Sequence, residues 1–103
     1  MSDADLLREA ADRLERLALR STPGDWRTTG LLASRPEVVA VRPDGGTEHV
    51  AEARASSAAW ITALSPAVAG PLAAWLREEA GVSSRSAHAV AVARHLLDRL
   101  PGA

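Results

Sequence analysis

The chain has 103 residues, of which 47% are apolar, and its formal net charge is −1. It contains no cysteine, which excludes disulfides, thiolate zinc sites and cysteine catalysis. The balanced charge argues against a surface that binds nucleic acid over its whole area. The length fits one domain, residues 1–103. The acidic N-terminal sequence and the lack of an apolar run of about 18 residues predict a soluble, cytoplasmic protein without a membrane contact.

The N-terminal segment predicts an amphipathic helix. Leu7 and Leu14 are two turns apart, and alanines and further leucines fill the same face. Charged residues occupy the other face as a solvated surface. A helix is therefore expected from about residue 3 to residue 20, with Ser2 or Asp3 as its N-cap.

Short runs rich in valine and threonine follow, over residues 26–29, 38–42 and 47–50. Pro23-Gly24 separates the first run from the helix, because proline presets φ for a turn and glycine accepts the positive φ that follows. Residues 43–46, Pro-Asp-Gly-Gly, are typical of a hairpin loop. These signals predict a three-stranded antiparallel meander, one face of which needs a covering helix.

The next part of the chain predicts two helices separated at a proline. The first ends near Leu64 and the second begins at Pro66, since the residue before proline leaves the α region whereas proline suits the first helical position. Trp60 and Ile61 lie on the long apolar stripe of this region and are expected in the core. Pro71 is expected to bend the second helix, because its nitrogen cannot donate to the carbonyl four residues earlier.

A last helix is expected over residues 84–99, after Gly81 ends the preceding one and with Ser83 or Ser84 as N-cap. The whole pattern predicts an α+β fold. An N-terminal helix and three C-terminal helices pack on one face of the small three-stranded antiparallel meander. Because phenylalanine and tyrosine are absent, the three tryptophans are expected to be the bulky pieces of an alanine-rich core.

Three motifs in order give the chain a resemblance to a known group. Thr22–Trp26 reads T-P-G-x-W, Ala58–Pro66 reads A-x-x-I-x-x-x-x-P, and Ala89–Arg94 reads A-x-A-V-A-R. The chain resembles small actinobacterial proteins of phage and mobile-element origin, and the resemblance covers nearly its whole length. Several members carry a Cys/His cluster before the last helix, where this chain has serines and one histidine. The resemblance implies a fold and a phage-related setting, not a mechanism.

The histidines and the aspartate of the last predicted helix are not spaced for a metal site or a catalytic group. His88 and His95 are two helical turns apart, about 10.5 Å along the axis, which is too far for a shared metal in the usual i, i+4 arrangement. Asp98 joins them on a similar side of the helix. No G-x-S-x-G turn presents a serine nucleophile. We therefore expect no catalytic residue, no cofactor and no metal, and a protein that is not an enzyme.

The leading hypothesis is a protein-interaction module whose partner is a second copy or another protein. A thin core cannot bury all of the apolar side chains, and those that remain exposed are expected to form a patch that a partner covers. The candidate interface residues are Leu31, Leu32, Trp75 and Val82.

The alternative is a DNA-binding transcriptional regulator with a helix-turn-helix at residues 72–97. Gly81 would open the turn, and Ser84, Arg85 and His88 would face DNA. Arg85 is the only strong cation at the front of the recognition helix. Since phosphate contacts usually need several cations, this alternative predicts weak binding without dimerisation.

Overall fold

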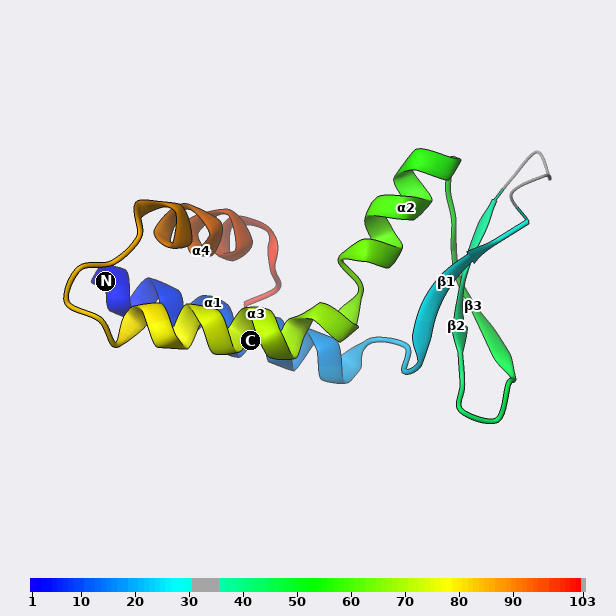
Figure 1. The fold of residues 1–103 in the computed structure, drawn as a ribbon, viewed down its shortest axis with the longest axis horizontal. Coiled ribbons are helices and arrows are strands. Elements are labelled where there is room, and N and C mark those ends of the chain that lie inside the picture. Colours follow the sequence, from blue (N-terminus) through cyan, green and yellow to red (C-terminus); the bar gives the residue numbers. More distant parts are fainter. Residues whose placement is uncertain (31–35, 103) are drawn as a thin grey trace. The chain divides into compact units, whose positions relative to one another are not determined.

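The computed structural model describes residues 1–30 and 36–102 and confirms the predicted α+β class and order of elements (Figure 1). The described residues form α1 (Asp3–Arg20), β1 (Asp25–Thr29), β2 (Glu37–Val41), β3 (Thr47–Glu52), α2 (Ala55–Ala63), the 3₁₀ helix η1 (Pro66–Val68), α3 (Ala69–Ala80) and α4 (Ala87–Arg99). Contacts divide the chain into two compact units. The helical unit comprises Met1–Arg20 and Ala69–Ala103, and the sheet unit comprises Ser21–Val68.

The N-terminus of α1 is capped as predicted. The Ser2 hydroxyl accepts a hydrogen bond from the backbone N–H of Asp5 at 3.1 Å, and the Ser2 N–H donates to the Asp5 carboxylate at 3.3 Å. This reciprocal arrangement satisfies donors that the first turn of a helix leaves without partners. Hydrogen bonding of the Asp5 carboxylate by the side chain of Ser2, and next by its backbone N–H, lowers the pKa of Asp5 below its usual value.

The core of the helical unit is built mainly from alanine. Leu7 and Leu76 are its only large side chains that are fully buried in the described residues. Small side chains let α1, α3 and α4 approach closely and leave little room for aromatic rings. The cluster contains Leu7, Ala10, Ala11, Ala73, Leu76, Ala80, Ala89 and Ala93.

Arg77 links α3 to α1 at the edge of this core. Its guanidinium donates to the carboxylate of Asp12 at 2.8 Å and to that of Glu15. The hydrogen bond with Asp12, and after it the one with Glu15, raises the pKa of Arg77 above its usual value. Since its side chain is 43% exposed, solvent screens the two ion pairs. Arg77 therefore orients two packed helices without being buried.

The sheet unit contains the predicted meander, with strand order β1-β2-β3 and both pairs antiparallel. Val38 and Ala40 of β2 are fully buried. They lie opposite Thr28 and Trp26 of β1, on the side where α2 packs over β1 and β2. The one fully buried residue of α2 is Ala58. Thus α2 covers the sheet, while α1, α3 and α4 bury their apolar faces against one another.

The turns of the sheet unit have the predicted chemistry. Gly24 has a φ of 119°, and a Cβ at this position would lie 2.8 Å from the carbonyl oxygen of Val41. In the hairpin loop Gly45 has a φ of 87°. Its N–H and that of Arg42 close the loop by donating to the carbonyls of Arg42 and Gly46, at 2.9 and 2.8 Å. Glycine is favoured at these two positions because a side chain at such a φ is strained.

Two predictions about the helices need correction. Pro71 lies in the first turn of α3, which begins at Ala69 after η1, and N–H groups of a first turn have no partner within the helix. Proline therefore removes no hydrogen bond of α3 at this position, and the predicted bend has no cause. The N-cap of α4 is Ser86, not Ser83 or Ser84, and its hydroxyl accepts from the second and third N–H groups of the helix.

The tryptophans are not the bulky core pieces that we expected. Trp60 is 71% exposed and Trp75 is 40% exposed, while Trp26 is half-buried. Two positions along a helix correspond to about 200°, so Trp60 points away from the sheet when Ala58 points into it. Ile61, the other predicted core residue of α2, is half-buried.

One described stretch, Ala55–Ala80, is long and apolar enough to cross a membrane by length and composition, which we did not expect from the sequence. The structure does not form one helix there. It ends α2 at Ala63 and begins α3 at Ala69. The stretch is weak evidence for a membrane span.

Candidate functional site

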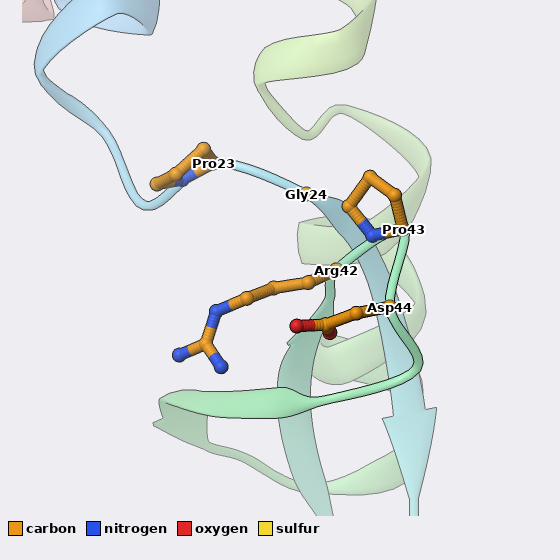
Figure 2. Close-up of a pocket in the computed structure, with 5 residues that line it drawn as sticks. All are labelled: Pro23, Gly24, Arg42, Pro43 and Asp44. Carbon is orange, nitrogen blue, oxygen red and sulfur yellow. The ribbon is translucent and has the colours of Figure 1, made fainter.

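A concavity of about 330 Å³ lies beside the hairpin loop of the sheet unit. Figure 2 shows its lining, in which Gly24 lies between two proline rings and the side chains of Arg42 and Asp44 extend to the same side. The Asp44 carboxylate accepts the backbone N–H of Gly46 at 2.7 Å. The Arg42 guanidinium lies 3.5 Å from the Glu48 carboxylate. Both charged groups thus have partners that hold the turn.

This concavity offers no reactive arrangement. Its lining contains one carboxylate and one guanidinium, each held by a partner in the turn, and no histidine or hydroxyl side chain (Figure 2). Acid–base or nucleophilic catalysis needs a reactive group that a second polar side chain activates, and neither charged group here is arranged in that way. The concavity is best explained by the turn geometry that Gly24 and the hairpin impose.

A second hollow, an open groove of about 440 Å³, runs between β1 and the end of α2. Thr62 and Ala63 of α2 form one wall, and residues 25–28 of β1 form the other. The indole N–H of Trp26 donates to the carbonyl of Thr22 at 2.9 Å. The polar atom of this ring is therefore satisfied, and its apolar surface faces the groove.

Among the described residues of the sheet unit, the large apolar side chains that are exposed are Trp60 on α2 and Leu64, the C-cap of this helix. We call the exposed residues Ala59, Trp60, Ala63 and Leu64 the Trp60 face. Trp60 is 71% exposed and Leu64 is 58% exposed, and their i, i+4 spacing puts them on one side of the helix. No charged residue occurs from Ala55 to Leu76. This uncharged run does not mark which side of α2 faces solvent, so sequence reasoning missed the face.

The predicted DNA-contacting residues do not share one helix. Ser84 and Arg85 lie in the segment between α3 and α4, and only His88 is on α4. The Arg85 guanidinium donates to the carbonyl of Ala80 at 3.1 Å, which caps the C-terminus of α3. The connection runs from residue 81 to residue 86, longer than the three or four residues of a helix-turn-helix.

The predicted interface residues lie in different settings. Trp75 is on α3 and Val82 is just beyond its end, and they are 40% and 38% exposed. Both are available for a contact, although less so than Trp60. Leu31 and Leu32 lie outside the described residues.

His88, His95 and Asp98 are all exposed on α4. The described residues contain no group of three or more histidine or carboxylate side chains placed to hold a metal ion. The fold presents the Trp60 face at α2 and a groove beside β1. No protein-family model, no curated protein and no solved structure matches the chain.

Proposed function

We propose that this chain is a non-enzymatic protein-interaction module that binds an apolar, uncharged surface of another protein through the Trp60 face. The observation that carries the proposal is the exposure of Trp60 and Leu64, 71% and 58%, on a helix without a charged residue. Exposed apolar residues that adjoin one another on a soluble protein usually mark an interaction site.

The composition of this face favours a partner of the same chemistry. Covering Trp60 and Leu64 removes apolar surface from water and desolvates no charge on α2, so no ion pair is needed for compensation. Tryptophan is enriched among the residues that dominate binding energy. Ala59 and Ala63 beside it let a partner approach the helix closely. A groove that accepts an amphipathic helix would fit these features.

The motif resemblance to actinobacterial phage and mobile-element proteins supports an accessory-element setting for this module. A DNA-binding role has less support, because Arg85 contacts the α3 carbonyl terminus and Ser84 precedes α4. The proposal therefore puts the partner contact on the sheet unit, not on the segment 72–97.

The test compares two variants of the full chain as bait in an extract of the source organism. Trp60→Ser combined with Leu64→Ser removes the face, whereas Leu19→Ser removes an 86% exposed leucine from α1 as a matched control. A partner retained by the parent and by Leu19→Ser is purified, and its Kd is measured by calorimetry. We expect the double variant to bind at least about tenfold more weakly.

Two outcomes would overturn the proposal. One is equal affinity of the purified partner for the parent and the double variant. The other is a salt-sensitive mobility shift of mixed genomic DNA that Arg85→Ala abolishes, which would make DNA the primary ligand.

A further inference from the structure

β1 is an edge strand with a groove beside it. The sheet order β1-β2-β3 leaves one side of β1 without a neighbouring strand. Within the part of the chain that the structure describes, Asp25–Thr29 makes no backbone hydrogen bond beyond the sheet. An edge strand carries a row of N–H and C=O groups that another strand can pair with. The groove between β1 and α2 gives the side chains of such a strand a place to lie.

The side chains of β1 alternate in a way that separates two surfaces. Trp26 and Thr28 are half-buried on the face that α2 covers, whereas Asp25, Arg27 and Thr29 are exposed. A strand added to β1 therefore meets apolar and hydroxyl groups on one face and charges on the other. The Arg27 guanidinium lies 2.6 Å from the Asp25 carboxylate, and the two side chains are 69% and 59% exposed.

These charges select a second copy of β1 in one register. If two copies run antiparallel about a two-fold axis at Trp26, Asp25 of each copy lies opposite Arg27 of the other, and the two Trp26 residues are neighbours. Opposite charges directly across a strand pair are stabilising, and symmetry makes the contact twice. Moving the axis to Arg27 would put two guanidinium groups opposite each other, which is unfavourable.

We infer that β1 pairs with β1 of a second copy of this chain, antiparallel and centred on Trp26, to form one continuous six-stranded sheet. The Trp26 and Thr28 side chains of each copy line the shared groove with Thr62 and Ala63. Both α2 helices then lie on the same face of the sheet, so the dimer presents two Trp60 faces. This surface shares only Ala63 with the Trp60 face, and the inference does not rest on the proposed partner contact.

A contact over five residues per strand is small, so the dimer is expected at the weak end of specific association. Sedimentation equilibrium of the full chain from about 1 μM to about 1 mM covers this range. Hydrogen exchange measured at both ends of the range locates the contact. Backbone amides of Asp25–Thr29 should exchange more slowly at high concentration, because half of an edge strand's N–H groups point outward.

Charge reversal tests the register. Asp25→Arg alone and Arg27→Asp alone should each weaken dimerisation by about tenfold, since each puts like charges across the axis twice. An equimolar mixture of the two variants should restore association as a heterodimer, and the double reversal in one chain should restore the homodimer. Both side chains are exposed, and circular dichroism verifies that each variant is folded.

Glu48→Arg on β3, the other edge strand, is the matched control and should leave the dimer unchanged. Trp60→Ser with Leu64→Ser should leave it unchanged as well, which separates this contact from the proposed partner site. A chain that stays monomeric over the whole range would overturn the inference. So would a dimer that neither reversal weakens, a mixture that fails to associate, or a dimer that Glu48→Arg disrupts.

Discussion

Replacing Trp60 by alanine distinguishes a surface tryptophan from a core tryptophan by its effect on stability. A tryptophan side chain can bury about 150–250 Å², and Trp60 is 71% exposed, so it covers about 45–70 Å². At about 25 cal/mol per Å² this burial stabilises the fold by at most about 1–2 kcal/mol. Alanine keeps part of the contact. We therefore expect Trp60→Ala to lower the free energy of unfolding by about 1 kcal/mol.

A buried tryptophan replaced by alanine would instead cost about 3–5 kcal/mol. Urea unfolding followed by far-ultraviolet circular dichroism measures the difference, because fluorescence would change with the loss of the indole. Val38→Ala, at a fully buried site of the same unit, serves as the control and should cost about 2 kcal/mol. If Trp60→Ala instead lowers the free energy of unfolding by about 3 kcal/mol or more, the ring is buried. That result would remove the observation behind the proposed function.

Three further predictions follow from single contacts. Gly24→Ala should destabilise the chain by about 1–3 kcal/mol in thermal or urea unfolding, and by more than Gly45→Ala, because both have positive φ but only Gly24 approaches β2. Arg77→Ala should cost no more than about 1 kcal/mol, since its two ion pairs are exposed, and 1 M salt should reduce the cost. Because the pKa of Asp5 is lowered in the folded chain, its carboxylate contributes stability above the usual carboxyl pKa, and this contribution is lost as the pH falls. Without the Ser2 hydroxyl less of this stability exists, so the Tm of Ser2→Ala should fall less than that of the parent on acidification. Equal acid dependence of the parent and Ser2→Ala would refute this assignment.

Much of the fold could be predicted because the local signals agree with one another. The turn at Gly24 and the loop at Gly45 have residues whose backbone preference fixes the chain direction, and the valine-rich strand between them needs burial. The limits of α1 were predicted equally well, since its charges mark the solvent side and Ser2 marks its start. At these positions propensity, periodicity and capping all indicate the same element.

The orientation of α2 could not be predicted, for a physical reason. A helix is usually oriented by the contrast between its apolar and charged sides, and α2 has no charged residue to mark the solvent side. Trp60 and Ala58 are both apolar, and only the depth of the space above the sheet decides which one is buried. The closeness of α2 to the sheet favours the methyl group of Ala58.

The start of α4 shows a second kind of limit. Several serines precede it, and each of them is a competent N-cap in isolation. Ser86 is selected by a contact from the preceding helix, because its backbone N–H donates to the Glu79 carboxylate at 3.0 Å while its hydroxyl caps α4. A tertiary contact of this kind leaves no periodic trace in the sequence. The shift removes Ser84 and Arg85 from the helix on which the DNA-binding hypothesis depends.

The alanine-rich core and the exposed tryptophans have one cause. Helices that meet through alanines pack too closely to enclose an indole ring, so a large side chain in such a chain is placed at the margin of the core or outside it. Trp75 follows this rule at the edge of α3, and in the sheet unit Trp60 lies in solvent while the smaller Ala58 is buried. The residues best suited to dominate a protein contact are therefore the ones that this core cannot hold. For this chain, the composition that makes the interior thin also leaves exposed the side chains on which the proposed partner contact depends.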